Sequence, residues 1–231
     1  MTDECINAHV LELVHLTSSV LQVTLQPEQY IDYYAGQYLE LVIGCESFAY
    51  SIANAPFGPQ VYILHIRHRL DNPIPPQILQ ALHQPQIKIR VPQGLCHVHA
   101  LDSRSSLVCV AGGSGIAQIK SILDHMSQQQ DPRPINLFWG VRLQEDFYLQ
   151  ASIDQWHLQL PNFKSLMQIS DLDRSPLIYA VLEQTRDLQQ AQIVLSGPFA
   201  MVYHARDVLI NAGLLVENLF ADAFDFENIG E

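Results

Sequence analysis

The 231-residue chain is short of basic residues, cysteines and long apolar runs, and each shortage excludes a class of function. Its 12 Lys and Arg residues stand against 24 Asp and Glu, which gives a formal net charge of −12 at pH 7. The few basic residues are scattered along the chain. Because such a surface repels phosphate backbones and anionic lipid, we expect neither a nucleic acid nor a membrane as a partner.

The four cysteines are Cys5, Cys45, Cys96 and Cys109, and they form no C-x-x-C pair. This predicts free thiols, no iron–sulfur centre and no metal site. The first residues lack the basic start and apolar stretch of a signal peptide. No apolar run reaches the roughly 18 to 20 residues that a membrane-spanning helix needs. We therefore expect a soluble, cytoplasmic protein.

Residues 6–100 carry the signals of β-strands. Short runs with alternating or β-branched apolar residues are separated by Pro, Gly, Asp and Asn turns. This pattern predicts an antiparallel β-barrel or sandwich. One short helix is expected within residues 73–85, "PIPPQILQALHQP", because proline is tolerated in the first turn of a helix.

After "LDSRSS", at residues 101–106, the pattern changes to strand, helix, strand, helix. Such alternation predicts a parallel sheet with helices on its faces. The chain length, with 48% hydrophobic residues, is sufficient for two modest cores. We therefore predict a two-domain β plus α/β protein, with an antiparallel β-barrel domain at residues 1–101 and an α/β nucleotide-binding domain at residues 102–231.

The stretch "VCVAGGSGIAQIKSIL", residues 108–123, leads a strand through three glycines directly into a helix. Bare backbone N–H groups and the N-terminus of a helix at one point suit an anion such as a phosphate. A second turn of this kind, at residues 196–198, follows the last predicted strand. Because such turns meet at the carboxyl ends of parallel strands, the pair predicts a nucleotide cleft.

The letters of these turns leave other readings open. Gln118 stands where the dinucleotide fingerprint G-x-G-x-x-G has its last glycine, and no GK[ST] follows. Ser114 between glycines is similar to the nucleophile elbow G-x-S-x-G of hydrolases, but Ile116 replaces the last glycine of that motif. Each turn also fits a plain strand-to-helix connection, in which Gly197 only turns the chain and Pro198 only starts a helix.

Several stretches, read in order, resemble the ferredoxin–NADP reductase superfamily, most closely its NAD(P)H:flavin oxidoreductase branch. They are "YAGQYLELVI", "YSIANAP", "IRVPQGLC", "VAGGSGIAQIKSIL", "FWGVRLQED", "LSGPFAMV" and "LFADAFDF". Their order is specific, although each stretch alone is not. The resemblance implies a barrel that binds FAD or FMN, an α/β half that binds NADH or NADPH, and hydride transfer from nicotinamide C4 to flavin N5 between them.

The resemblance also implies roles for individual residues. Tyr50 flanks the isoalloxazine ring, Ser51 is the catalytic hydroxyl near N5, and Ile52 continues the same flavin motif. Without this context, Tyr50 fits a core aromatic and Ser51 an ordinary strand hydroxyl. The residues implied for the nicotinamide nucleotide lie in the glycine turns and after "FWGV": Gly112, Gly113, Ser114, Gly115, Arg142, Ser196, Gly197 and Pro198.

The last matching stretch is the tail with Asp222, Ala223 and Phe224. In the family this aromatic and acidic tail closes the site, so Phe224 is expected over the flavin. The same letters also fit a terminal strand that packs on the sheet.

Two positions depart from the family pattern. Phe48 stands where the flavin motif has arginine, which removes the usual partner of a flavin phosphate. The segment around Arg67 lacks the small residues that hold flavin phosphates at a helix start. Arg67 and Arg69 are the candidate replacements, although an arginine on a barrel strand is also typical of a solvated rim.

We therefore expect an NAD(P)H-dependent flavin reductase that reduces FMN, FAD or riboflavin as an exchangeable substrate. The reduced flavin would serve a flavin-using oxygenase or another electron acceptor. The alternatives are a reductase component that passes electrons to a protein partner, and a divergent module that only binds nucleotide. Glu145 and Asp146 predict that NADH serves at least as well as NADPH, because they repel a 2′-phosphate, whereas Arg142 argues for NADPH.

Overall fold

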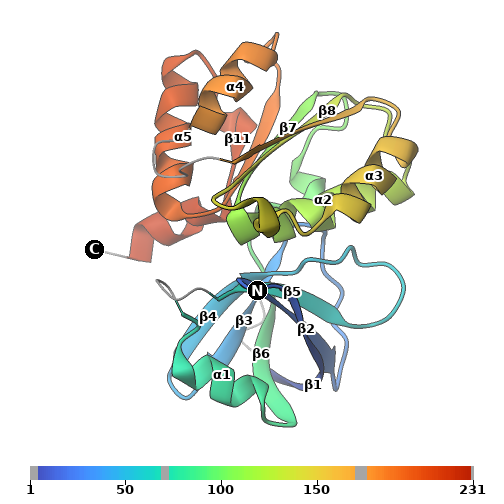
Figure 1. Ribbon diagram of the computed structural model, residues 1–231, viewed down its shortest axis with the longest axis vertical. Coiled ribbons are helices and arrows are strands. Elements are labelled where there is room, and N and C mark those ends of the chain that lie inside the picture. Colours follow the sequence, from blue (N-terminus) through green and yellow to red (C-terminus); the bar gives the residue numbers. More distant parts are fainter. Residues whose placement is uncertain (1–4, 69–72, 170–175, 230–231) are drawn as a thin grey trace.

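The computed structural model describes residues 5–68, 73–169 and 176–229 and consists of two halves stacked along the long axis of the molecule (Figure 1). All strands of the first sheet lie between residues 6 and 93, and all strands of the second lie between residues 107 and 220. The division at residues 101 and 102 stays a prediction.

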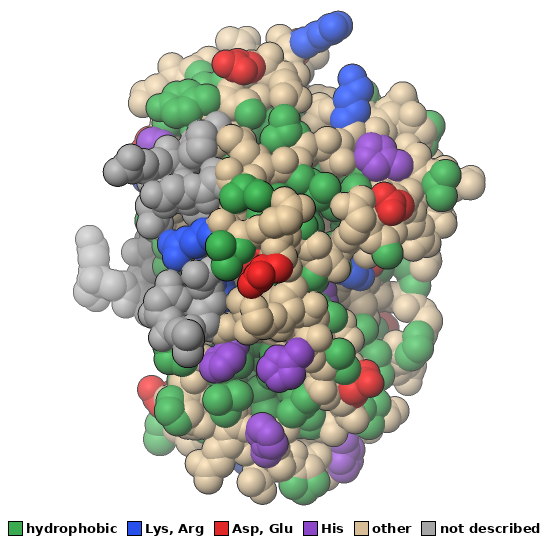
Figure 2. All heavy atoms as spheres, viewed as in Figure 1, with side chains coloured by type: hydrophobic (Ala, Val, Ile, Leu, Met, Phe, Trp, Pro, Cys, Tyr) green, Lys and Arg blue, Asp and Glu red, His purple; other side chains and the backbone are tan. Residues whose placement is uncertain are grey.

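On the face that Figure 2 shows, the Lys and Arg side chains are few and separated.

The first sheet is antiparallel and barrel-like, with the strand order β4-β3-β6-β1-β2-β5. Within the described residues, its edge strands β4 and β5 are joined by an isolated bridge between Ile52 and Leu64 and not by a continuous ladder, so the barrel is not fully closed. This half confirms the predicted antiparallel fold and the short proline-started helix. Its elements are β1 (Ile6–Thr17), β2 (Val20–Pro27), β3 (Tyr38–Ile43), β4 (Glu46–Ser51), β5 (Tyr62–Arg67), α1 (Pro76–Leu82) and β6 (Gln86–Gln93).

The period of two along β5 determines which of its residues reach the other half. Tyr62, Leu64 and Ile66 point into the barrel core and are at most 1% exposed. The residues between them therefore point outward, and this places His65 and Arg67 on the side of the α/β half.

The second sheet is parallel, with the strand order β11-β10-β7-β8-β9, which confirms the predicted α/β half. Helices α2 and α3 pack on one face of the sheet, and α4 and α5 pack on the other (Figure 1). The strands are β7 (Leu107–Gly112), β8 (Ile135–Val141), β9 (Phe163–Ile169), β10 (Gln192–Ser196) and β11 (Leu219–Phe220). The helices are α2 (Ile116–Gln128), α3 (Gln150–Gln159), α4 (Pro176–Gln184) and α5 (Phe199–Asn211).

The strand order of the second sheet reverses between β7 and β10. The chain runs outward from β7 through β8 to β9, and it then returns to place β10 and β11 on the other side of β7. Ligands of open parallel sheets bind at such a switch point, beyond the carboxyl ends of the strands. Both glycine turns lie there.

Short 3₁₀ helices complete the fold: η1 (Val98–Ala100), η2 (Gly113–Gly115), η3 (Gln144–Asp146), η4 (Val216–Asn218) and η5 (Asp222–Ile229).

Within the described residues, no helix has both the length and the apolar character that crossing a bilayer requires.

Candidate active site

Two adjoining cavities lie between the barrel and the α/β half. The larger, of about 500 Å³, is walled by β4, the start of α5 and the C-terminal tail. The smaller, of about 340 Å³, is walled by β4, β5 and both glycine turns. Tyr50, Ser51, Ser196 and Gly197 line both cavities, so the two form one continuous cleft.

The structure brings most of the predicted site residues to this cleft. Those that line it are Tyr50, Ser51, Arg67, Gly112, Ser114, Gly115, Ser196, Gly197 and Pro198. Gly113 and Arg142 lie beside it, around a cavity of about 20 Å³ that Arg67 and Ser114 also line. Among the described residues, no histidine is hydrogen-bonded to Ser114, so the structure does not support a hydrolase built on that serine.

Ile52 is placed differently from the other predicted residues. Its side chain is fully buried in the barrel core, and its backbone forms the bridge to Leu64. The chain at Ile52 therefore joins the edges of the barrel and does not wall the cleft. Arg69 lies outside the described residues.

Phe224 also does not line the cleft. Its ring lies 6.3 Å from the ring of Tyr203, and the guanidinium of Arg206 lies 5.9 Å from its centre. Because these α5 side chains hold the ring, the expected closure by Phe224 is not the arrangement in this structure. Asp222 and Ala223 line the larger cavity instead.

The two glycine turns contact each other directly. A Cβ atom on Gly115 would lie 2.3 Å from the carbonyl oxygen of Ser196, so only glycine permits this approach. Gly113 differs, because it has a φ of +55° and a Cβ there would meet no atom within 4 Å. The turn therefore offers its open side to a ligand at Gly113, while Gly115 fastens it to the neighbouring turn.

Trp139 on β8 is hydrogen-bonded to the first glycine turn. Its indole Nε1–H donates to the carbonyl oxygen of Gly113 at 3.0 Å, and its side chain is fully buried. Phe147 and Tyr148 pack edge-on against the indole, with ring centres 5.1 and 5.6 Å away. The segment after β8 thus supports the turn.

The same segment binds the barrel. The hydroxyl of Ser18 donates to Glu145 at 3.2 Å, and the hydroxyl of Ser19 donates to Asp146, which is 8% exposed. Both carboxylates are therefore directed at the turn between β1 and β2. A preference for NADH stays a prediction, but these two acidic residues no longer provide its geometric basis.

Gln118 has a role that its mismatch to the fingerprint did not reveal. Its side chain is 1% exposed, and its amide donates to the carbonyl of Gly36 at 2.9 Å and to Asp222 at 2.7 Å. Burial, and secondarily the charge of Asp225, raises the pKa of the Asp222 carboxyl well above its usual value. Gln118 therefore ties α2 to the barrel and to the C-terminal tail.

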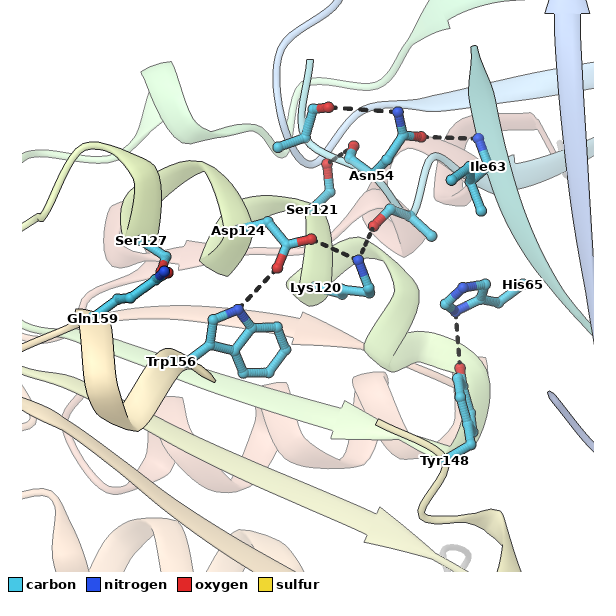
Figure 3. Close-up of polar contacts among 12 residues, drawn as sticks. Asn54, Ile63, His65, Lys120, Ser121, Asp124, Ser127, Tyr148, Trp156 and Gln159 are labelled. Carbon is cyan, nitrogen blue, oxygen red and sulfur yellow. Dashed lines mark hydrogen bonds and ion pairs between the residues drawn. The ribbon is translucent and has the colours of Figure 1, made fainter. Parts of the chain in front are cut away.

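A polar cluster fastens α2 to the loop after β4 (Figure 3). Ser121 donates to the carbonyl of Asn54 at 2.6 Å, and Lys120 pairs with Asp124 at 2.6 Å. The indole of Trp156 donates to the other oxygen of Asp124 at 2.9 Å. The Ser121 bond therefore ties α2 to the barrel, whereas the Trp156 bond ties α2 to α3 and the Lys120–Asp124 pair lies within α2.

His65 is a cleft residue that the sequence analysis missed. It is 6% exposed and lines the smaller cavity, and its Nδ1 lies 3.2 Å from the hydroxyl of Tyr148 (Figure 3). Burial, and secondarily the charge of Lys120, lowers the pKa of His65 to about 3. The alternation along β5 was the one signal that could have placed it on the outer face.

The buried neutral His65 predicts a loss of stability in acid. Its pKa is about 3 in the folded chain and about 6.5 when unfolded, so only the unfolded chain takes up the proton between these values. The free energy of unfolding should therefore fall by about 2 kcal/mol from this residue between pH 6.5 and pH 5. Urea unfolding at both pH values should show a smaller fall for His65→Gln, and an unaltered fall for His157→Gln at an exposed position. An equal fall in the wild type and His65→Gln would contradict the prediction.

Comparisons with known proteins agree with this geometry. The family described as the oxidoreductase NAD-binding domain matches residues 109–207. The chain is 31% identical to an NAD(P)H-flavin reductase of Aliivibrio fischeri over 235 residues, which cover 96% of this chain and 99% of that protein. The chain belongs to the flavin reductase branch of the ferredoxin–NADP reductase superfamily.

Some relatives are longer than this chain. The chain is 32% identical to the CDP-6-deoxy-L-threo-D-glycero-4-hexulose-3-dehydrase reductase of Yersinia pseudotuberculosis, over 93% of this chain and 66% of that protein. It thus spans about two thirds of the length of that relative. The solved cytochrome P450 reductase GcoB of Amycolatopsis has the same fold, with a TM-score of 0.80, 21% identity and coverage of 95% of this chain and 69% of that one.

Proposed function

We propose that this protein is an NAD(P)H-dependent flavin reductase, in which hydride passes from NADH or NADPH to FMN, FAD or riboflavin in the cleft. The observation that carries the proposal is the position of Tyr50 and Ser51, which face both glycine turns across one cavity. Similarity to the Aliivibrio fischeri NAD(P)H-flavin reductase over nearly its whole length supports it.

The larger cavity is the proposed flavin site. Tyr50 offers an aromatic wall, and the hydroxyl of Ser51 lies where the two cavities join. Asp222 lines this cavity too, and within the described residues its buried Oδ1 has no hydrogen-bond partner. Bound flavin supplies the hydride acceptor, and the residues of the chain stack, orient and hydrogen-bond its ring.

The smaller cavity is the proposed site of the nicotinamide nucleotide. The open side of Gly113 and the N-terminus of α2 suit its pyrophosphate. Arg67 and Arg142 approach the same turn from the barrel and from β8 and add positive charge there. The two turns thus hold the donor between the sheet and Ser51.

In this assignment, residues 1–101 bind flavin and residues 102–231 bind the nucleotide.

We also place the protein in the cytoplasm. Its four cysteines are all free, as expected of a reducing compartment.

A visible-spectrum titration of the purified protein with riboflavin, FMN and FAD, followed by NADH and NADPH oxidation, tests the proposal. We expect saturable flavin binding and flavin-dependent oxidation of the nucleotide. Nucleotide binding without any flavin binding would overturn the proposal and favour the divergent nucleotide-binding module.

The cleft predicts weak discrimination between flavins. Phe48 lines the larger cavity and has no donor for a phosphate, so affinity must rest on the ring that all three flavins share. We expect dissociation constants for riboflavin, FMN and FAD within about tenfold of one another and a protein that purifies mostly colourless. Phe48→Arg should tighten FMN and FAD about 10-fold or more, but not riboflavin, because it adds a charge-assisted bond.

Phe48→Met is the control for lost packing, since Phe48 also packs against the barrel core. It should weaken all three flavins equally. A wild type that purifies yellow with stoichiometric FAD and does not bind riboflavin would show that another group, such as Arg67, binds the phosphates. The flavin would then be a resident cofactor and not an exchangeable substrate.

We propose a reductase component that delivers electrons to a protein partner as the second candidate function. It is favoured by the similarity to the longer Yersinia pseudotuberculosis protein, which its name describes as the reductase of a dehydrase. The first candidate function requires the reduced flavin to leave, for a flavin-using oxygenase or another acceptor. Gel filtration of the flavin-loaded, NADH-reduced protein separates the two, because only an electron-delivering component retains its flavin.

A further inference from the structure

His65 lies beside Ser51 on the wall of the cleft. The antiparallel bridge between Ile52 and Leu64 sets the register of the two edge strands, and its continuation by one residue places Ser51 opposite His65. Both line the smaller cavity, together with Ser114 of the first glycine turn. His65 is therefore at the end of the nucleotide site that adjoins the proposed flavin site.

The hydrogen bond between His65 and Tyr148 indicates which ring nitrogen carries the proton. Its Nδ1 is 3.2 Å from the Tyr148 hydroxyl, and that hydroxyl has no other hydrogen bond among the described residues. If Nδ1 donated, the phenol proton would have no acceptor among the described residues, whereas the reverse arrangement leaves only the cavity-facing Nε2–H without a partner. The Tyr148 hydroxyl is therefore assigned as the donor to Nδ1, and the proton of the ring is on Nε2.

The Nε2–H of His65 has no partner among the described residues, although the residue is only 6% exposed. Because the ring lines the smaller cavity, this donor is available to a bound molecule. Burial keeps the imidazole uncharged at neutral pH. A neutral donor suits an uncharged acceptor, whereas Arg67 and the N-terminus of α2 serve the phosphates.

We propose that His65 binds the carboxamide oxygen of the nicotinamide ring through Nε2–H, and that Tyr148 positions the imidazole for this bond. The inference rests on the proposed function, since it needs the nucleotide in the smaller cavity. It makes His65 a residue that recognises the nicotinamide end. Because Tyr148 belongs to the other half, the donor is oriented only when barrel and α/β half are together.

Equilibrium binding of NADH and of ADP-ribose to the flavin-free protein tests the proposal, because ADP-ribose lacks the nicotinamide ring. His65→Phe removes the donor and keeps an aromatic ring. It should raise the dissociation constant of NADH about 3- to 10-fold and leave that of ADP-ribose unchanged. His65→Gln, which places an amide N–H near the position of Nε2, should restore most of the NADH affinity. Tyr148→Phe should cause a smaller loss, because the ring is then less well oriented.

The outcomes separate this inference from the proposed function. A wild type that binds neither NADH nor ADP-ribose overturns both. If the wild type binds both ligands and His65→Phe weakens them equally, or weakens neither, only the assignment of His65 is overturned. Thermal unfolding of each variant shows whether it is folded, and riboflavin binding should be the same in all of them.

Discussion

Replacing Ser51 by alanine is expected to slow hydride transfer about 10- to 1,000-fold while leaving the dissociation constant of NADH nearly unchanged. Ser51 lines both cavities at the point where they join, so its hydroxyl can reach a flavin in the larger one. A hydrogen bond to the N5 region matters most in the transition state, when charge shifts onto the ring. Single-turnover bleaching of bound flavin by NADH measures the rate directly.

Two matched variants make the Ser51→Ala result specific. Ser51→Thr keeps the hydroxyl and should retain most of the rate. Ser47→Ala removes a hydroxyl from the same strand and the same larger cavity, but far from the junction with the smaller one, and should change the rate little. If Ser51→Ala reduces flavin at the wild-type rate, Ser51 is only a strand hydroxyl and the flavin is placed wrongly.

The elements of both halves could be predicted from the sequence because their signals are local. Alternation with a period of two marks β5, and the apolar face of α2 repeats at helical spacing. The glycines between β7 and α2 mark the break between strand and helix, and a short stretch of sequence contains all of them. The wall of the cleft built from β4 and the two glycine turns followed from the resemblance to a family, not from any single motif.

The partners of buried polar groups could not be predicted, because they depend on residues distant in the chain. Gln118 bonds Gly36 and Asp222, which are 82 and 104 residues away, so the sequence showed only a missing glycine. His65 meets Tyr148 across 83 residues. Nothing in either local stretch indicates that pairing.

The loop after β8 shows the same limit. Its acidic residues have the composition expected near a nucleotide ribose, yet Ser18 and Ser19 of the barrel bind Glu145 and Asp146 across 127 residues. The sequence around Phe224 matches the tail that closes the site in the family, but the ring of Phe224 packs against Tyr203 on α5. In both cases tertiary contacts with distant residues decided which way the side chains point, and composition does not encode those contacts.

Because the two glycine turns are in close contact, adding one methyl group at Gly115 should have a large effect on stability and on NADH binding. A Cβ on Gly115 would lie 2.3 Å from the carbonyl oxygen of Ser196 and 2.6 Å from the amide nitrogen of Gly197. Both are backbone atoms, so no side-chain rotation relieves the overlap and the turns must separate. The backbone of Gly115 itself, at φ −58° and ψ −18°, suits alanine, so only the contact is at issue.

Gly115→Ala is therefore expected to lower the free energy of unfolding by about 3 kcal/mol and to weaken NADH about 100-fold, because the cleft loses its shape. Gly113→Ala is the matched control. Its φ of +55° costs alanine about 1 to 2 kcal/mol, but a Cβ there meets no atom within 4 Å. Urea unfolding of both variants separates close approach from backbone strain. NADH titration compares Gly115→Ala with the wild type, because a methyl group on Gly113 would itself face the proposed pyrophosphate site. If Gly115→Ala is as stable as Gly113→Ala and binds NADH as the wild type does, the turns do not touch, and the cleft between Ser51 and the nucleotide is wider than this structure has it.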